Sequence, residues 1–201
     1  MIIAEDEGGL SIRLMRDEVG DFELMVNWRN RPHVREWWDP DDPPVTLQDV
    51  MAKYQSRTDP DETTTACVIE LGARPIGYLQ FYPWDDYSVE AEECGWVPRP
   101  GWWGIDQFIG EADLIGRGLG TRIVSLICSH LAVAVHARAV ALMVDQNNHR
   151  AIRCYEKVGM RNHGTALDTD TRSGVRVASW LMVKTLNDAG RPREPESSPG
   201  S

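Results

Sequence analysis

Two spacings of apolar residues divide the chain into short strands and helices. Apolar and polar side chains alternate from Ser11 to Met15, which predicts a strand with one buried face. Two β-rich runs, Thr64–Leu71 and Pro75–Tyr82, flank Gly72-Ala73-Arg74 and are typical of a hairpin. Further strands are expected over residues 102–109, 138–145, 160–166 and 175–184.

Capping residues and apolar repeats predict four helices among these strands. Asp17 can cap a first helix, and Thr46 with Asp49 three positions later resembles the capping box of a second. Two more helices are expected over 118–136, where the apolar repeat is regular, and over 148–157. The order β-α-α-β-β-β-α-β-α-β-β predicts a single mixed α/β domain.

The length and the two ends of the chain fit one domain with loose termini. A chain of 201 residues and 22.7 kDa can bury roughly two-thirds of its unfolded surface. Residues 1–10 are acidic and contain glycine, and residues 187–201 are rich in proline, glycine and charge. We expect both ends to be disordered and the domain to span residues 11–186.

Composition also narrows the class of protein. No basic segment followed by an apolar run opens the chain, and no stretch approaches the roughly 20 apolar residues of a membrane span, so we expect a cytoplasmic protein. The four cysteines are scattered and the five histidines lack metal-ligand spacing, so neither disulfides nor a metal is predicted.

The chain is strongly acidic. Its formal net charge is −10, from 31 acidic and 21 basic residues. This charge repels polyanions, which argues against a nucleic-acid partner and favours a cationic substrate. Surface acidity that only keeps the protein soluble is the alternative.

The segment Ile115-Gly116-Arg117-Gly118-Leu119-Gly120-Thr121 gives the strongest local indication of a binding site. Its glycines permit tight turns that aim free backbone N–H groups at one point, at the positive end of a helix, where a phosphate binds well. The segment lacks the Gly-Lys-Ser/Thr ending of a P-loop, and residues 111–114 are not the strand that a dinucleotide fingerprint requires. A glycine-rich helix start without a ligand is the remaining alternative.

A second motif follows about thirty residues later. Residues 148–160 read Asn-His-Arg-Ala-Ile-Arg-Cys-Tyr-Glu-Lys-Val-Gly-Met, a short helix capped by Asn147 or Asn148 and stopped by Gly159. Together with the glycine segment, the pattern Asn-x-x-Ala-x-x-x-Tyr-x-x-x-Gly resembles the acetyl-CoA-binding half of the GNAT N-acetyltransferases. That family usually has Gln or Arg in place of Ile115, which removes one side-chain contact and leaves the backbone amides unchanged.

This resemblance implies a fold and a cofactor site. The fold would be α/β (α+β), with a mixed central sheet of about seven strands, a splay between its two central strands and about four flanking helices. Acetyl-CoA would be the co-substrate, without a metal. The glycine segment would hold the pyrophosphate, Asn148 would contact the pantetheine arm, and strand N–H groups would polarise the thioester oxygen. The implied cofactor-binding residues are Gln107, Phe108, Ile109, Ile115, Gly116, Arg117, Gly118, Leu119, Gly120, Thr121, Asn148 and Tyr155.

The acceptor side is similar to the aminoglycoside 6′-N-acetyltransferases. Residues 27–38, 76–82 and 104–107 carry this likeness, which spans about residues 11–185 with gaps at 83–101 and 145–148. An aminoglycoside is a polycation with weakly apolar sugar faces, so its pocket needs carboxylates and aromatic walls. The resemblance implies Trp38, Tyr54, Gln80, Tyr82, Asp106 and Asp145 as substrate-binding residues.

Two residues are the implied catalytic pair. A charge in the middle of a strand is costly without a purpose, and by resemblance Asp106 receives the acceptor amine and removes its proton. Tyr155 would protonate the departing thiolate. The alternatives are a surface-facing carboxylate for Asp106, a helix cap for Asp145 and a core aromatic for Tyr155.

Further candidate pocket residues lie in the aromatic and acidic segments of the chain. Trp37 and Trp38 cannot both face inward on one regular element, so we expect Trp38 in the pocket and Trp37 in the core. Either Asp168 or Asp170 matches a further substrate-binding acid of the resembling family. Five acids in the loop before Trp96 could add negative charge: Asp85, Asp86, Glu90, Glu92 and Glu93.

The sequence therefore predicts acetyl transfer from acetyl-CoA to the 6′-amine of aminoglycosides, which would confer antibiotic resistance. The enzyme would be a monomer or homodimer and would bind neither nucleic acid nor membrane. The nearest alternative is an N-acyltransferase for N6-hydroxylysine, a family similar to a pattern with His in place of Asp106. A polyamine acetyltransferase and a non-catalytic acyl-CoA-binding protein are the others.

Overall fold

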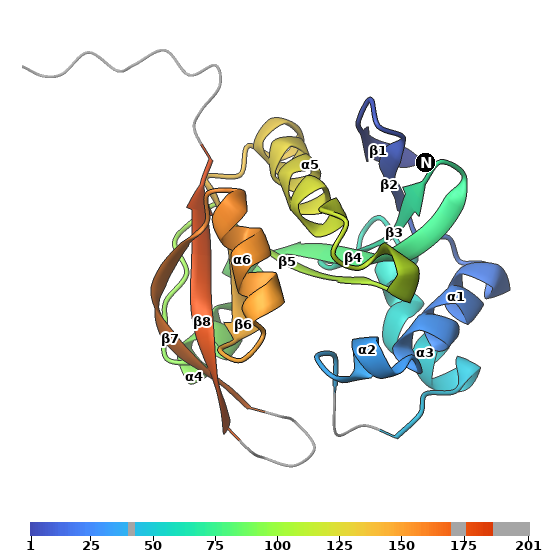
Figure 1. Cartoon of the computed structure of the whole chain (residues 1–201). Helices are drawn as coiled ribbons and strands as arrows, with labels where there is room; N and C mark the ends of the chain where they lie inside the picture. The colour runs from blue at the N-terminus through green and yellow to red at the C-terminus, as the bar shows by residue number, and fades with distance from the viewer. Residues whose placement is uncertain (40–42, 170–175, 187–201) are drawn as a thin grey trace, which may run out of the picture.

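The fold is that of a computed structural model, which describes residues 1–39, 43–169 and 176–186 (Figure 1). Its centre is one eight-stranded sheet in the order β1-β2-β3-β4-β5-β6-β8-β7. The strands are β1 (Ile2–Glu5), β2 (Leu10–Leu14), β3 (Thr65–Leu71), β4 (Arg74–Pro83), β5 (Trp102–Ile109), β6 (Ala139–Asp145), β7 (Arg161–Thr169) and β8 (Arg176–Thr185). In the described part of the sheet β5 and β6 are the parallel pair, and the other neighbours are antiparallel. The predicted mixed α/β class is confirmed, with eight strands rather than about seven.

Six α-helices accompany the sheet in the described residues, two more than predicted. They are α1 (Val19–Arg29), α2 (Pro32–Arg35), α3 (Leu47–Tyr54), α4 (Ser88–Glu93), α5 (Leu119–Ala134) and α6 (His149–Lys157). Three 3-10 turns join them: η1 (Ser56–Thr58), η2 (Trp84–Tyr87) and η3 (Ala112–Leu114). The capping box predicted at the start of α3 is present, since Thr46 and Asp49 exchange both bonds. The unexpected α2 and α4 have only four and six residues, too few for a periodic apolar pattern.

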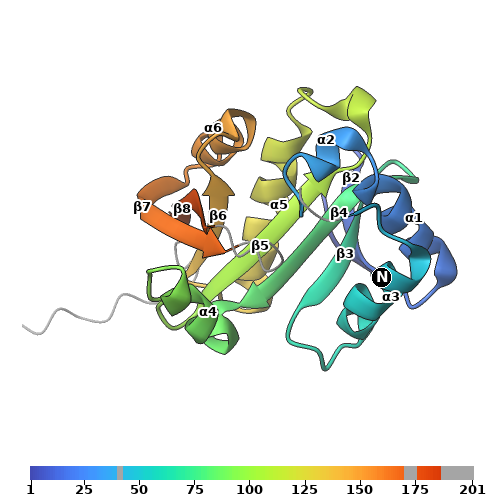
Figure 2. The same cartoon turned by 90° about the horizontal axis from the view of Figure 1, so that it is seen from below.

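Helices cover both faces of the sheet (Figures 1 and 2). The two-residue period of β3 places Cys67 and Ile69 in a core with α5, while Ala66 and Val68 join a second core with α1 and α3. A third core packs η2 and α4 against β6, β7 and β8. The sheet is therefore buried on both sides, and side chains on its two faces reach different helices.

The sheet splits between its two parallel strands. β5 and β6 pair only where residues 102–104 face residues 139–141. Beyond these residues β5 continues to Ile109 and β6 to Asp145, but the two strands no longer pair with each other. Figure 2 shows their ribbons diverging. The predicted splay is confirmed, and it leaves half of β5 with an open edge.

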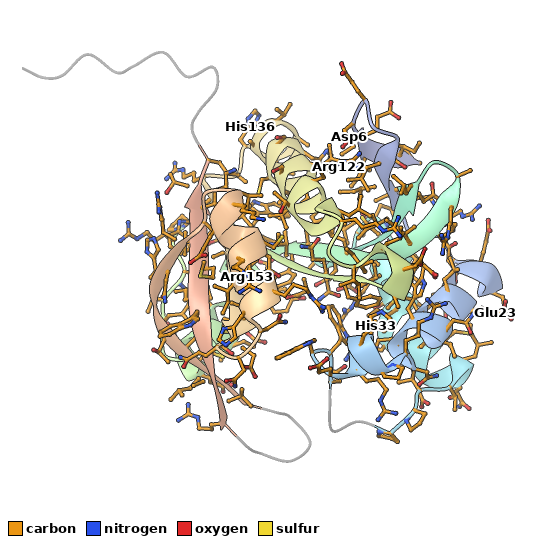
Figure 3. All side chains as sticks on the ribbon, viewed as in Figure 1. Asp6, Glu23, His33, Arg122, His136 and Arg153 are labelled. Carbon is orange, nitrogen blue, oxygen red and sulfur yellow. The ribbon has the colours of Figure 1, made fainter. Side chains whose placement is uncertain are left out.

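The N-terminus differs from the prediction. Residues 1–10 are not disordered, because β1 pairs with β2 and the carboxylate of Asp6 accepts hydrogen bonds from the N–H groups of Gly8 and Leu10. Arg122 of α5 binds Asp6 through Nη2 at 2.8 Å and Nε at 3.0 Å, and Figure 3 shows the two side chains together. A four-residue strand is too short for a clear alternation of apolar residues, and the contact with Arg122 cannot be predicted from the neighbouring sequence. The predicted tail, residues 187–201, lies outside the described residues.

Candidate active site

A cavity of about 780 Å³ occupies the split between β5 and β6. Its walls come from α2, β5, the start of α5, the end of β6 and α6, and Figure 3 shows His33 and Arg153 on its opposite sides. The structure brings sixteen of the predicted site residues to this cavity: Trp38, Tyr54, Gln80, Asp106, Gln107, Phe108, Ile109, Ile115, Gly116, Gly118, Leu119, Gly120, Thr121, Asp145, Asn148 and Tyr155.

Two predicted residues lie elsewhere. Arg117 lies between two left-handed glycines, is exposed and is not part of the cavity wall. Tyr82 lines an adjoining cavity of about 200 Å³, where its ring packs against Trp84 and Tyr87. The smaller cavity shares Gln80 and Asp106 with the larger one, so the two spaces meet at these side chains.

The glycine segment forms a cradle at the start of α5. Gly116 and Gly118 have φ angles of 80° and 79°, a left-handed conformation that strains other residues. Gly118 is the N-cap of α5 and carries no side chain to bind the N–H groups of the first turn. These N–H groups and the positive end of the helix face the cavity, which suits a pyrophosphate.

The open edge of β5 supplies a second row of backbone groups. Gly110 donates its N–H to Ile76 of β4 at 2.8 Å, which fixes which residues of β5 point toward β4. Because neighbouring residues of a strand alternate, the N–H and C=O groups of Ile105, Gln107 and Ile109 point to the open edge, and those of Phe108 point to β4. His33 of α2 already contacts the Ile109 carbonyl oxygen through Nε2 at 3.2 Å.

Asp106 lies opposite Gln80 in the register of β4 and β5. The Gln80 Nε2 atom donates to Asp106 Oδ2 at 2.8 Å. Both side chains project to the face that carries α1 and α3, next to Tyr78 and Phe108 of the second core. Asp106 is thus half-buried at the junction of the two cavities rather than on the outer surface.

Tyr155 projects from α6 into the same cavity. Burial raises the pKa of its hydroxyl, and the nearby ionisable side chains of Cys154 and Asp106 raise it further, against a hydrogen bond from the Gln107 side chain. The hydroxyl therefore keeps its proton at neutral pH and can donate it. Gln107 Oε1 is a buried acceptor without a partner among the described residues, which fits a ligand that brings a donor into the cavity.

The turn between β6 and α6 explains two further residues. Asn148 is the N-cap of α6 and accepts the N–H of Ala151 at 3.1 Å, so the cap is Asn148 rather than Asn147. Asp145 does not cap the helix. Its carboxylate accepts the backbone N–H of Asn147 at 2.7 Å and lines the cavity.

The aromatic residues of the acceptor side differ in part from the prediction. Trp37 and Trp38 both line the cavity, because they follow α2 in a turn where regular helix spacing does not apply. The Trp38 ring also packs against Tyr78 and Phe108 at 6.0 and 5.0 Å between centroids. Tyr54 is fully buried, and its hydroxyl accepts a hydrogen bond from Arg29 at 3.0 Å.

Sequence reasoning missed several charged residues of the wall. Arg150, Arg153 and Lys157 project from one face of α6, and the spacing i, i+3, i+7 could have indicated a shared cationic face. The wall also includes Glu36 and Asp39 from the turn after α2, Lys53 from the end of α3 and Arg57 from η1. Of the five acids in the loop before Trp96, Glu90 lines the smaller cavity and the other four line neither. Asp170 and the side chain of Asp168 lie outside the described part of the chain.

The described residues hold neither a metal-ligand cluster nor a helix suited to cross a membrane. No group of three or more His, Cys, Asp or Glu side chains there could hold a metal ion. None of the helices in that part of the chain has the length and apolar character to cross a membrane.

Comparison with known proteins places this geometry among acetyltransferases. A family model described as an acetyltransferase (GNAT) domain matches residues 17–166. Aminoglycoside N(6′)-acetyltransferase type 1 of Klebsiella pneumoniae is 32% identical over 171 residues, 84% of this chain and 82% of that protein. A solved structure of AAC(6′)-Ib with ribostamycin and coenzyme A superposes with a TM-score of 0.75 at 31% identity, covering 93% of this chain and 99% of that one. Spermine/spermidine N(1)-acetyltransferase of Bacillus subtilis is 30% identical over 60 residues, 30% of this chain and 40% of that protein.

Proposed function

The chain belongs to the GNAT acetyltransferase family, and from this premise we propose that it transfers an acetyl group from acetyl-CoA to the 6′-amine of aminoglycosides. One observation carries the proposal. A half-buried carboxylate, Asp106, and a proton-holding phenol, Tyr155, line one cavity together with an uncapped helix start. This cavity offers a base, an acid and an anion site within one space.

The residues on the cradle side would hold the cofactor. The first-turn N–H groups of α5 bind the pyrophosphate, and the cationic face of α6 adds attraction for phosphate. The open edge of β5 and the Gln107 amide lie where the pantetheine arm would pass. Bound acetyl-CoA supplies the activated acetyl group.

The acid and the base act on opposite sides of that acetyl group. Asp106 takes a proton from the acceptor ammonium and so exposes the nitrogen lone pair for attack on the thioester carbon. The N–H of Gln107 on the open β5 edge stabilises the carbonyl oxygen as its charge grows. Tyr155 donates its proton to the sulfur as the carbon–sulfur bond breaks, and the second proton of the attacking nitrogen then passes to the Tyr155 phenolate. The products are CoA thiol and the neutral amide, and Asp106 holds the first proton until it is released to water.

The acceptor side suits a polycation with sugar rings. Glu36, Asp106 and Asp145 bring carboxylates to the wall of the larger cavity, and Trp37 and Trp38 bring flat apolar surfaces. The similarity to an aminoglycoside N(6′)-acetyltransferase over 84% of the chain supports the 6′-amine as the target. Such an enzyme would act in the cytoplasm, where acetyl-CoA is available, and would protect a cell that expresses it.

A thermal-shift experiment tests this proposal and separates it from its alternatives. We expect acetyl-CoA alone to raise the melting temperature, and kanamycin or tobramycin to raise it further when CoA is present. No response to acetyl-CoA would contradict the cofactor site. A further rise with spermine and none with either aminoglycoside would move the acceptor to the polyamines, and a response to acetyl-CoA alone would favour a binding protein.

A further inference from the structure

The Gln80 side chain connects three residues at the junction of the two cavities. Its Oε1 atom accepts hydrogen bonds from Tyr78 Oη at 2.8 Å and from Arg57 Nη1 at 2.5 Å. Its Nε2 atom donates to Asp106 Oδ2 at 2.8 Å. Arg57, Gln80 and Asp106 all line both cavities, so this chain of contacts lies at the site itself.

The chemistry of the donors fixes the orientation of the Gln80 amide. The guanidinium of Arg57 has N–H groups and no acceptor, so it must face Oε1 and not Nε2. Burial raises the pKa of Tyr78 well above its usual range, so its hydroxyl keeps its proton and can also donate to Oε1. With Oε1 held by two donors, the amide N–H is directed at the carboxylate of Asp106.

Arg57 itself packs on the aromatic ring of Tyr54. Its guanidinium lies 5.1 Å from the centroid of the Tyr54 ring, an arrangement in which the cation is attracted to the ring face. Tyr54 is fully buried and fixed by its bond to Arg29. The fixed Tyr54 ring therefore limits the movement of the Arg57 side chain, which extends from the short turn η1.

We propose that Arg57 is a positioning residue that acts through Gln80 to keep an N–H donor on the carboxylate of Asp106. An N–H donor stabilises the ionised form of a carboxylate, which is the form that can accept a proton. Without Arg57 the remaining partner of Oε1 is the Tyr78 hydroxyl, which can accept a hydrogen bond as well as donate one, so the amide can rotate and Asp106 can lose its N–H donor. The importance of this orientation for turnover rests on the proposed function, while the orientation itself does not.

The direct test follows the ionisation of Asp106 by carbon NMR of labelled aspartate carboxyl groups. The full chain is titrated without acceptor or cofactor, and the Asp106 signal is assigned by its loss in Asp106→Asn. Arg57→Met keeps the length of the side chain and removes its donors, and Gln80→Leu removes the amide. We expect each variant to raise the titration midpoint by about one pH unit, the scale of one hydrogen bond to a charged group.

The double variant Arg57→Met/Gln80→Leu separates action through Gln80 from simple charge attraction. If Arg57 works through the amide, the double variant shifts the midpoint no further than Gln80→Leu alone. Additive shifts, or no shift in Arg57→Met, would overturn the proposal. Lys53→Met is the matched control, because Lys53 stands over the same Tyr54 ring at 5.8 Å and pairs with Asp39 instead of Gln80. In Lys53→Met the Asp106 midpoint is expected to stay in place. Arg57→Lys keeps a donor and should bring the midpoint part of the way back to the wild-type value.

The same variants link the orientation to catalysis. The acid limb of the pH profile of kcat/KM should move to higher pH in Arg57→Met and Gln80→Leu, in step with the NMR midpoint. A protein that shows the NMR shifts yet acetylates no aminoglycoside would contradict the proposed function and support the positioning role. An active enzyme whose NMR midpoint does not respond to Arg57→Met would do the opposite.

Discussion

Cys154 packs against Gly120 so closely that a Cβ atom on this glycine would lie 3.1 Å from the cysteine Sγ atom. Thr121 adds a contact from its Oγ1 atom to the same sulfur at 3.7 Å. The first turn of α5, which forms the cradle, therefore rests directly on the residue next to Tyr155. Cradle and candidate acid are held as one unit across two helices.

This contact predicts an unusual response to alanine. In most helices Gly→Ala raises the free energy of unfolding, by up to about 1 kcal/mol. In Gly120→Ala we expect no gain, because the new methyl group presses on Cys154. Urea unfolding should show the gain restored when Gly120→Ala is made in a Cys154→Ala background. Equal gains in both backgrounds would mean that the two residues are not in tight contact.

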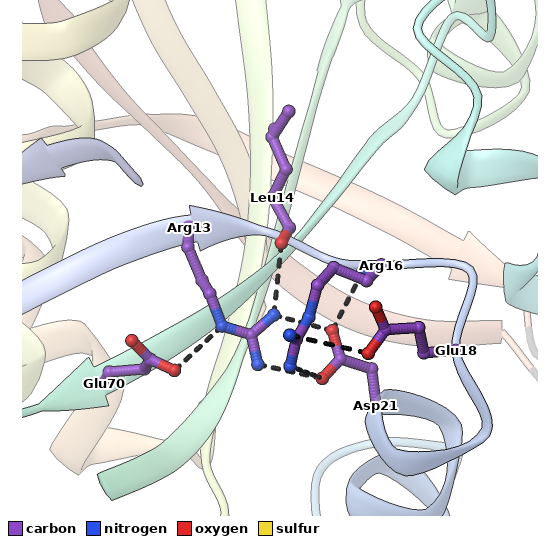
Figure 4. Close-up of polar contacts among 6 residues, drawn as sticks. All are labelled: Arg13, Leu14, Arg16, Glu18, Asp21 and Glu70. Atoms are coloured by element: carbon purple, nitrogen blue, oxygen red, sulfur yellow. Dashed lines mark hydrogen bonds and ion pairs between the residues drawn. The ribbon is translucent and has the colours of Figure 1, made fainter. Parts of the chain in front are cut away.

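A buried ion cluster joins β2, β3 and α1 at some distance from the cavity (Figure 4). Arg13 binds Asp21 at 2.6 Å and Glu70 at 2.8 Å, and the side chain of Asp21 is only 2% exposed. Asp21→Asn removes the charge that receives two buried hydrogen bonds from Arg13, while Glu70 still pairs with Arg13, so the change should cost about 1.5–3 kcal/mol of unfolding free energy. The exposed pair Arg16–Glu18 is the control, and Glu18→Gln should cost at most about 1 kcal/mol.

The same cluster predicts how stability depends on pH. Burial by itself would raise the pKa of Asp21, but hydrogen bonds from Arg13 and Arg16 outweigh it and hold the pKa below its ordinary value. Stability from this group is therefore full above its unfolded pKa of about 3.9 and is lost as the pH falls through the lower folded pKa. The free energy of unfolding of the wild type, measured with urea, should fall as the pH is lowered through this range. Asp21→Asn should lack this part of the decline, and parallel curves for the two proteins would refute the assignment.

Tyr155→Phe tests the candidate acid. We expect turnover to fall by roughly ten- to a hundredfold, since water can replace the phenol in part, with little change in acetyl-CoA affinity. Because burial and the neighbouring charges raise the pKa of Tyr155, the ratio of wild-type to variant turnover should stay constant up to about pH 10. Steady-state kinetics over this range measure both quantities. A defect confined to acetyl-CoA affinity would reduce Tyr155 to a binding role.

Asp106→Asn tests the candidate base. Acetyl-CoA binding should be retained, while turnover should fall by about a hundredfold or more, the usual scale for loss of a general base. Calorimetry and steady-state kinetics on the same preparation separate the two effects. Turnover within about threefold of wild type would remove Asp106 from the chemistry.

The sequence predicted the central sheet and its cradle well because both have local causes. Left-handed glycines, a capping box and alternating apolar residues each determine structure within a few positions, as at Gly116, Gly118 and Thr46. The N-terminal strand and the short α2 and α4 were missed, because contacts distant in sequence, such as Asp6 with Arg122, hold them.

The same distinction applies to the site. Sixteen residues that the resemblance implied line one cavity in the structure, but the resemblance did not indicate Arg57 or the cations of α6. Arg57 contacts Gln80 because the fold brings η1 next to β4. The residues around position 57 contain no pattern that predicts this contact. Placement of a side chain by a turn depends on the packing of the whole N-terminal half.

The central claim is transfer to one particular nitrogen, and product analysis tests it most directly. Neomycin and paromomycin differ at the 6′ position, where the first bears an amine and the second a hydroxyl group. With acetyl-CoA and the purified protein, we expect mass spectrometry and NMR to find one acetyl group on the 6′-nitrogen of neomycin and of kanamycin, and none on paromomycin. Equal acetylation of paromomycin, or acetylation of hydroxylysine or spermine with no reaction at any 6′-amine, would contradict the account.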